Sequence, residues 1–332
     1  MADPQTCGSV GSYAKLLVED SDIVGDYDPA TFDSNSERYE FLRETITYSD
    51  VLLGGNGITG GIDPIAAHLR SGTRIVHGQI FMEVGPVELS AWLPRIFGNT
   101  DTPPTFTTAE TFDLTPFDLF IRRDQGDSLY RHCAVNSAAF RCRASIEGEE
   151  QVMQMMLDII GYQEHGAETW PVTEPALPSS NELYWLLGDG KLSLDVDGDA
   201  TLQADEEYYF DAFNLLIDNN LVPQTRNFLR VTCLQSRGRK IRLQVSTPYT
   251  SSTHTDLYIS RFDGKGQLNF LGTKNLSGTS ESTYTTTIDF PRLVQTRRTP
   301  NVSGPGEIPL SLDLEAFRTS SAEPITVTNS TS

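Results

Sequence analysis

The sequence predicts a mainly β protein with two tandem domains of sandwich or barrel type, each with a short flanking helix. Three observations carry this prediction. Segments rich in β-branched and aromatic residues, separated by turn formers, recur along most of the 332 residues. One segment has clear helical periodicity. The order of strand-like segments in the first half is weakly repeated in the second half, as internal duplication would produce.

The first domain is predicted to span residues 37–165, after an N-terminal arm (residues 1–36) with little periodicity. Its first strand starts near Arg38 and is followed by a glycine-rich loop. Further strands are expected from residue patterns of the same kind. They cover Arg74–Glu83, Thr105–Thr111, Phe117–Arg122 and Tyr130–Ala144.

A helix is predicted to begin at Pro86 and to end at Gly98. Proline is tolerated in a first helical turn, and glycine is the usual residue just past a helix end. Between them, apolar residues follow the spacing of one helix face, which we expect to pack on a sheet. These residues are Leu89, Trp92, Leu93 and Ile96.

The segment Glu150–Gly161 is mostly apolar and could form either a helix or a strand. The turn-like residues before it favour a strand that returns from the preceding one. In a strand, alternate side chains share one face. The residues expected on the buried face are Met153, Met155, Leu157 and Ile159.

A proline-rich linker is predicted at residues 166–182, and a second β domain at residues 183–332. Strands are expected there at Lys191–Asp195, Tyr208–Ile217, Phe228–Leu234, Lys240–Val245, Leu268–Leu271, Tyr284–Phe290 and Pro309–Leu314. A second short helical segment is expected near Thr255–Tyr258, after Pro248.

Three segments of the first domain pair in order with three of the second. Arg38–Asp50 pairs with Tyr208–Asn219, His77–Glu83 with Arg239–Val245, and Ala144–Ile160 with Val302–Phe317. Similarity of this kind also arises by chance between β segments, so the duplication is a hypothesis.

The composition limits the classes of function. The chain has 45 acidic and 25 basic residues, a formal net charge of −20. A sequence-reading nucleic-acid binder needs a basic face, so the charge disfavours that class. The short apolar runs and the N-terminus without a signal peptide lead us to expect a soluble intracellular product. The four cysteines form no CxxC pair, and we expect them to be reduced.

At the paired segments the chain resembles the major tail tube proteins of long-tailed bacteriophages. The resemblance covers roughly residues 37–330, and its motifs are structural and degenerate. In the first half they are Phe41–Thr47, Gly55–Gly60, and Gly78–Ile80 leading through Glu83 and Pro86 to the Leu89–Ile96 helix. In the second half they are Asp189–Leu194, Asp218–Leu221, Thr247–Tyr249, Pro291–Leu293 and Gly306–Leu310.

The resemblance implies a structural virion protein, made late in infection, whose rings stack into a hollow conduit for DNA ejection. Two-domain members of that family form trimeric, pseudo-sixfold rings, so trimers are expected rather than hexamers. It also implies assembly in the host cytoplasm, and the tape-measure, terminator and distal tail proteins as partners. Genomic DNA would pass through without specific binding.

Simple geometry is compatible with such a conduit. If six domains each give four strands to one cylinder, the wall holds about 24 strands. At a spacing of about 4.8 Å and a tilt of about 40°, its circumference is about 150 Å. After about 5 Å of side chain is removed from each wall, the bore is about 40 Å, which admits duplex DNA.

An acidic wall would repel DNA weakly and evenly, whereas a basic wall would hold it. The candidate lumen acids are Glu83, Asp205, Glu206 and Glu207. The alternative is that the net charge serves only solubility.

The candidate for contact between rings is the glycine-rich loop, because a long hairpin can reach a neighbouring ring. Its residues are Gly54, Gly55, Asn56, Gly57, Ile58, Thr59, Gly60 and Gly61. An ordinary exposed loop is the alternative.

The motifs that suggest catalysis or cofactor binding lack the neighbouring residues or elements that those functions require. Gly55, Gly57 and Gly60 fit a dinucleotide fingerprint, but no helix is expected directly after them. The Asp195–Asp199 segment resembles a calcium loop, but its glycine is misplaced and the twelfth-position glutamate is missing. We therefore expect no enzyme activity, no metal and no cofactor. The rival functions are another tail or contractile-injection tube component, and an all-β ligand-binding module.

Overall fold

The mainly β class is confirmed by a computed structural model, which contains helix α1 and strands β1–β20. The strands pair antiparallel in large sheets that do not close into a barrel within one chain. The structure describes residues 14–20, 36–53, 70–99, 101, 104–109, 114–123, 126–143, 152–166, 175, 190–199, 201–203, 206–225, 231–248, 261–271, 284–296 and 309–331.

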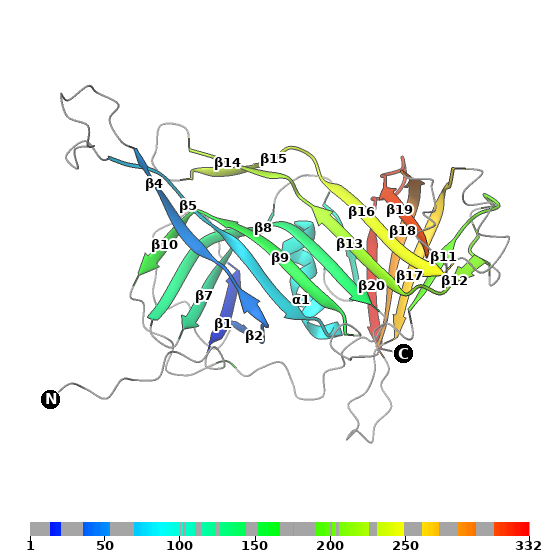
Figure 1. Cartoon of the computed structure of the whole chain (residues 1–332), viewed down its shortest axis with the longest axis horizontal. Coiled ribbons are helices and arrows are strands. Elements are labelled where there is room, and N and C mark those ends of the chain that lie inside the picture. Colours follow the sequence, from blue (N-terminus) through cyan, green and yellow to red (C-terminus); the bar gives the residue numbers. More distant parts are fainter. Residues whose placement is uncertain are drawn as a thin grey trace, which may run out of the picture.

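Eight strands form one continuous main sheet that runs through both halves of the chain (Figure 1). Each of them pairs with the next. In spatial order they are β4 (Thr47–Leu53), β5 (Arg70–Glu83), β9 (Gln154–Gly161), β8 (Gly126–Arg143), β13 (Ala212–Asp218), β16 (Lys240–Pro248), β19 (Pro309–Ala316) and β18 (Tyr284–Gln295). The two halves meet where β8 pairs with β13.

A second set of strands, each shorter than β8 and β18 and called the shorter strands below, attaches to these two strands directly or through other members of the set. In the first half these are β1 (Lys15–Asp20), β2 (Glu37–Tyr39), β7 (Phe117–Arg123) and β10 (Gln163–Gly166). In the second half they are β11 (Lys191–Leu194), β12 (Glu207–Tyr208), β17 (Asp263–Leu271) and β20 (Thr326–Thr331). The remaining strands are β3 (Arg43–Glu44), β6 (Thr105–Thr107), β14 (Leu221–Gln224) and β15 (Cys233–Ser236).

Helix α1 (Pro86–Phe97) has the predicted bounds. Gly98 ends it with φ 73°, a left-handed conformation, and its N–H donates to the Pro94 carbonyl. The expected apolar stripe Leu89, Trp92, Leu93 and Ile96 is buried. Leu89 and Leu93 lie beside Phe140 of β8 and Leu215 of β13, so the helix covers the line where the two halves meet.

Strand β9 follows the predicted alternation, because Met155, Leu157 and Ile159 are buried while the residues between them are partly exposed. Other boundaries differ. The expected strand Thr105–Thr111 is only β6, and the expected strand Tyr208–Ile217 is divided between β12 and β13. The expected second helical segment and most of the linker lie outside the described residues.

The N-terminal arm includes β1, which pairs with both β2 and β7. Arg95 of α1 ties this strand to the core. Its guanidinium donates to Asp20 at 2.7 Å and to Glu37 at 2.8 Å, and Tyr39 also donates to Glu37. Burial lowers the pKa of Arg95, but Tyr39 and the two carboxylates outweigh burial and raise it. Residues 15–20 are therefore part of the first half's fold.

The two halves have the same pairing pattern. In the first half, β1 pairs with β2 and β7, β8 with β7, β9 and β10, and β5 with β9 and β4. In the second half, β11 pairs with β12 and β17, β18 with β17, β19 and β20, and β16 with β19 and β13. Each of the eight strands named for one half thus has a counterpart among the eight named for the other half, whereas β6, β14 and β15 stand outside this pattern.

A β-bulge fixes which residues correspond. The β7–β8 register shifts between Phe117 and Leu119, opposite Cys133 and Tyr130. The β17–β18 register shifts in the same way between Gly264 and Gly266, opposite Leu293 and Phe290. Tyr130 therefore corresponds to Phe290, and Arg123, four residues after Leu119, corresponds to Phe270.

The cross-strand pairs extend this residue correspondence from β8 and β18 across the sheet to β3 and β13. Leu293 lies opposite Ala316, and Cys133 lies one rung beyond the Ala134–Ile160 pair, opposite Gly161. Ala316 pairs with Ile241, and Gly161 with Val76. Four residues along those strands, Val245 pairs with Phe213 and Ile80 pairs with Glu44. Glu44 and Phe213 are therefore equivalent positions.

Candidate functional site

The main sheet has one face that α1 and the shorter strands leave uncovered. Side chains alternate between this face and the core. In one cross-strand row the uncovered residues are Arg43, Phe81, Met156, Ala139, Leu216, Arg242 and Glu315. The row runs through both halves without interruption, as expected if the halves form a single surface.

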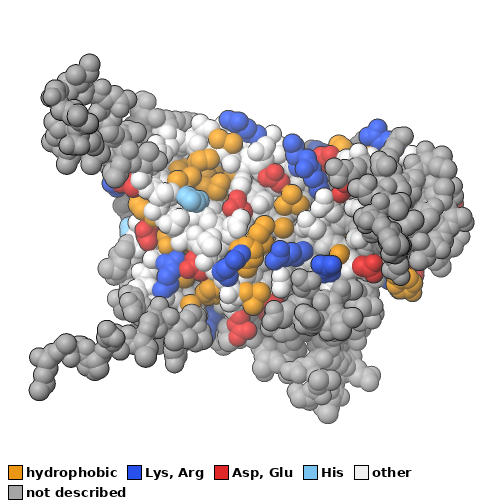
Figure 2. Space-filling view, in the orientation of Figure 1, with side chains coloured by type: hydrophobic (Ala, Val, Ile, Leu, Met, Phe, Trp, Pro, Cys, Tyr) orange, Lys and Arg blue, Asp and Glu red, His pale blue; other side chains and the backbone are white. Residues whose placement is uncertain are grey.

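Among the side chains that the structure describes, the charges on this face are balanced. Five basic residues point to it: Arg43, Arg141, Arg143, Lys240 and Arg242. Five acidic residues also do: Glu83, Asp158, Asp218, Asp313 and Glu315. Figure 2 shows both charges interspersed with hydrophobic side chains. Among the described side chains of these strands, this face therefore carries no excess of acids.

Hydrogen bonds link several of these side chains from strand to strand. Arg141 donates to Gln154 at 3.2 Å, and Gln244 donates to Asp313 at 3.0 Å. Arg43 stacks on the Phe81 ring at 4.1 Å. The Gln154 oxygen and the Phe81 ring thus contact the guanidinium groups of Arg141 and Arg43. These two cations are therefore less available to an external anion.

Asp158 lies near the middle of the same face. Burial raises the pKa of its carboxyl, the hydrogen bond from Asn136 (2.6 Å) and the charge of His77 oppose that rise, and Asp218 adds to it. Asn136 belongs to β8, the first-half strand at the junction, and its side-chain oxygen also accepts from the Leu221 N–H at 2.8 Å. The junction therefore holds a polar network as well as backbone pairing.

Asn219 and Arg239 join the two halves by hydrogen bonds at one end of this junction. This pair of residues is called the lock below. Asn219 is fully buried and donates to the Ile96 and Val135 carbonyls, both at 2.9 Å. Arg239 donates to the Asn219 side chain at 2.9 Å and to the Phe97 carbonyl at 2.7 Å. The cation thus sits at the C-terminus of α1, where the helix dipole favours positive charge. Burial lowers the pKa of Arg239, against a small opposing effect of Glu323.

On the far side of the first half, strands β3 and β4 form an edge of the main sheet. Among the described strands they pair only with β5. Three side chains gather there around the Ile46 backbone. The Glu44 carboxylate accepts from the Ile46 N–H at 2.8 Å, while Arg123 (3.2 Å) and the Tyr130 hydroxyl (3.3 Å) donate to the Ile46 carbonyl.

Arg123 and Glu44 also form an ion pair at 2.8 Å. Burial lowers the pKa of Arg123, but its hydrogen bonds to Glu44 and Tyr130 outweigh burial, and the pKa lies above its ordinary value. The cluster of Glu44, Arg123 and Tyr130 is called the edge cluster below.

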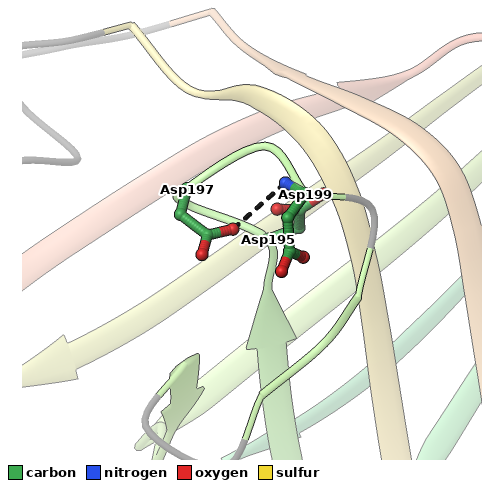
Figure 3. A group of neighbouring side chains, drawn as sticks. All are labelled: Asp195, Asp197 and Asp199. Carbon is green, nitrogen blue, oxygen red and sulfur yellow. Dashed lines mark hydrogen bonds between the residues drawn. The ribbon is translucent and has the colours of Figure 1, made fainter.

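The acidic turn after β11 is held by its own hydrogen bonds. Asp195, Asp197 and Asp199 have carboxylate oxygens within 4.8 Å of one another (Figure 3). Asp195 accepts from the Gly198 N–H at 2.7 Å, and Asp197 from the Asp199 N–H at 3.1 Å. These are the short-range bonds by which aspartates stabilise turns. The predicted tight turn accounts for the residues of this segment.

Glu206 is turned into the protein and closes that turn. Its carboxylate accepts from the Val196 N–H at 2.7 Å and the Gln203 N–H at 3.0 Å, and the residue is 8% exposed. The expectation that it faces a lumen is therefore corrected. Glu207 is exposed on β12 and accepts from Lys191 at 2.9 Å, away from the main sheet.

Of the four candidate lumen acids, only Glu83 lies on the uncovered face within the described residues. Asp205 and the loop candidates at residues 54–61 lie outside them. The buried lock and the edge cluster were not predicted from the sequence. The Asp218-Asn219-Asn220 turn was a visible signal for the lock, because turns rich in asparagine often fix a local backbone. Glu44 and Arg123 are 79 residues apart and gave no signal.

A family model described as phage tail tube protein matches residues 20–316 of the chain. No match was found among the curated proteins. Within the described part of the chain, no helix has both the length and the apolar character needed to span a membrane.

Proposed function

Because this chain belongs to the phage tail tube protein family, we propose that its copies join edge to edge into rings that stack as a hollow tube for DNA. Family membership makes it a structural protein of the virion tail that assembles with itself and with other tail proteins. The ring, its size and its conduit are the parts that we infer.

The pairing of β8 with β13 is the observation that carries the proposal. It joins two equivalent units inside one chain through their sheet edges. The same relation, applied once more, would join the continuation of β18 beyond Thr296 to the β3–β4 edge, the counterpart of β13, in another copy. Within the described residues β18 itself is paired on both sides, and its continuation lies outside them. An edge-to-edge contact that is not self-complementary continues from copy to copy until a ring closes.

Eight strands per chain set the size of the ring. Three chains would supply about 24 strands, for which barrel geometry gives a bore of about 40 Å. Since each chain already holds two units, a trimer would have pseudo-sixfold symmetry. Closure would also remove the open strand edges, which otherwise promote aggregation.

The uncovered face would line the bore, because α1 and the shorter strands already occupy the other face. The five acidic and five basic side chains described on it cancel in charge, so a passing duplex would meet neither strong attraction nor strong repulsion there. We therefore propose a lining of balanced charge over these strands, with Glu83 as one of its acids.

Electron microscopy of the purified protein over a range of concentrations tests the proposal. Hollow rods with threefold or pseudo-sixfold rings are expected. A protein that stays monomeric at all concentrations would contradict it and would favour a ligand-binding module.

The loop at residues 54–61 remains our candidate for contact between rings, on sequence grounds. Leu53 and Arg70 are paired neighbours, so residues 54–69 can be replaced by a two-residue turn without separating β4 from β5. Single rings that do not stack are expected from this variant. Rods of normal length would refute the assignment. Binding of tape-measure, terminator and distal tail proteins is likewise proposed and can be tested by co-sedimentation with the rods.

A further inference from the structure

We propose that the edge cluster is a removable cap: Glu44, Arg123 and Tyr130 hold the backbone groups that a second copy of this chain must bind. This rests on the proposed function, because it concerns the same β3–β4 edge. A cap of this kind would keep the free subunit from pairing at low concentration.

The first step concerns which backbone groups point away from the sheet. In an antiparallel strand, successive residues direct their N–H and C=O groups to opposite sides. Thr45 donates its N–H to the Gln79 carbonyl of β5, so Ile46 directs its groups outward. Ile46 is therefore the residue whose backbone faces an incoming strand.

The second half shows what those groups do when a strand is present. Ile46 corresponds to Leu215, because Glu44 corresponds to Phe213. Leu215 lies opposite Phe140 of β8. Asn219, on the same side of its strand, donates its N–H to the Asn136 carbonyl of β8 at 2.8 Å. The backbone N–H and C=O groups of β13 that point away from β16 are thus the ones that pair with β8 at the junction.

In the first half, side chains of the chain itself occupy the same groups. The Ile46 N–H is held by the Glu44 carboxylate, and the Ile46 carbonyl by Arg123 and Tyr130. A neighbouring strand would need both groups for its own hydrogen bonds. Inward-pointing charges and side-chain caps are known means of protecting sheet edges.

The equivalent positions in the second half cannot form such a cap. Phe213, Phe270 and Phe290 replace Glu44, Arg123 and Tyr130. The Phe213 and Phe270 rings pack with centroids 5.0 Å apart. Aromatic rings offer no acceptor for a backbone N–H and no strong donor for a carbonyl, and this edge is paired with β8. Within the described part of the chain, a charged cap thus occurs at the edge that has no further strand, and apolar residues occur at the edge that β8 fills.

The sharpest test replaces the three residues of the edge cluster by the residues at the equivalent positions of the second half. The triple variant Glu44→Phe, Arg123→Phe, Tyr130→Phe removes the cap and keeps packing that this backbone already accepts. Its critical concentration for rod formation, measured by sedimentation and microscopy, should fall about tenfold, because a charge-assisted hydrogen bond no longer has to be broken.

A milder variant guards against misfolding or unspecific aggregation of the triple variant. Glu44→Ala frees the Ile46 N–H and should lower the critical concentration in the same direction. Amide hydrogen exchange at Ile46 should become faster in its monomer and slow again in its rods. The matched control is Glu207→Ala, which removes an ion pair of similar length (2.9 Å against 2.8 Å) from β12. It should leave the critical concentration unchanged.

An unchanged or raised critical concentration in Glu44→Ala, with wild-type rods present, would overturn the cap and leave the proposed function standing. Unchanged exchange at Ile46 in the monomer would also overturn it. If neither wild type nor any variant forms rods or rings, the proposed function itself fails.

Discussion

The two halves of this protein share one pairing pattern but hold it together with different chemistry. At the bulge of the first half, Asp118 binds Arg131 at 3.0 Å and the His132 N–H at 2.8 Å, and all three residues are buried. At the bulge of the second half, Gly264 and Gly266 allow the close approach of neighbouring atoms. A backbone feature can thus be fixed either by a buried charge or by the absence of side chains.

The sheet edges differ in the same sense. The first half presents an ionic cluster at the β3–β4 edge, which no further described strand covers, and the second half presents aromatic residues at the edge that β8 fills. Side chains beside a filled edge are shielded from water, which favours apolar packing. Those beside an open edge must satisfy backbone groups until a partner arrives. The comparison teaches that the local environment, more than the repeat, selects the residue type.

The largest effect is expected at the bulge of the first half. Asp118→Ala would leave a buried Arg131 guanidinium without its carboxylate and His132 without an acceptor for its N–H. Removing one partner of a buried ion pair typically costs 3–5 kcal/mol, so we expect a loss of about 4 kcal/mol in the free energy of unfolding. Chemical denaturation measures it. Asp263→Ala, which removes an exposed ion pair of the second half, is the control and should cost under about 1 kcal/mol.

A smaller effect is expected at the bulge of the second half. In Gly264→Ala the added Cβ would lie 2.5 Å from the Asp195 carbonyl oxygen, which is backbone and cannot rotate away. We expect a loss of about 2 kcal/mol in the same measurement. Gly126→Ala is the matched control, because a Cβ there meets nothing within 4 Å. Equal costs for the two variants would show that close packing does not shape the second bulge.

The smallest effect concerns pH. Burial, the largest cause, lowers the pKa of His132; Asp118 opposes this and Arg131 adds to it. Between the lowered pKa and the ordinary value of about 6.5, the unfolded chain binds more protons than the folded chain. Stability should therefore rise with pH through this window and fall on acidification. The second-half counterpart, Arg292, stays charged and adds no such slope.

Denaturation curves at several pH values compare wild type with His132→Asn. Asparagine tolerates the positive φ of 50° at this position and does not titrate. The variant should have a flatter profile between pH 5 and pH 7 than wild type. If stability changes with pH equally steeply in the variant and in wild type, His132 is not the cause of the pH dependence.

Much of the fold followed from local pattern. The bounds of α1 were predicted from Pro86, Gly98 and the apolar stripe between them, and the alternation of β9 from its methionines and isoleucines. Both depend on residues close in the sequence. The acidic lining was predicted from composition, which does not say where a charge lies. Glu206 shows the limit, because its carboxylate is used inside a turn.

The edge cluster and the lock could not be predicted in this way. Glu44 meets Arg123, and Asn219 meets the end of α1, only because β strands distant in sequence are brought together. The internal repeat was visible as similar segments in the same order. The equivalence of Glu44 with Phe213 needed the hydrogen-bond registers of four strands.

By itself the sequence determined the β class, the bounds of helix α1, the order of the repeated strands and the resemblance that the family match supports. The tertiary structure alone decided which edge is filled within the chain, which is left open, and which side chains guard it. The physical reason is that alternation along a strand assigns a side chain to a face, whereas its neighbour across the sheet is chosen by long-range pairing.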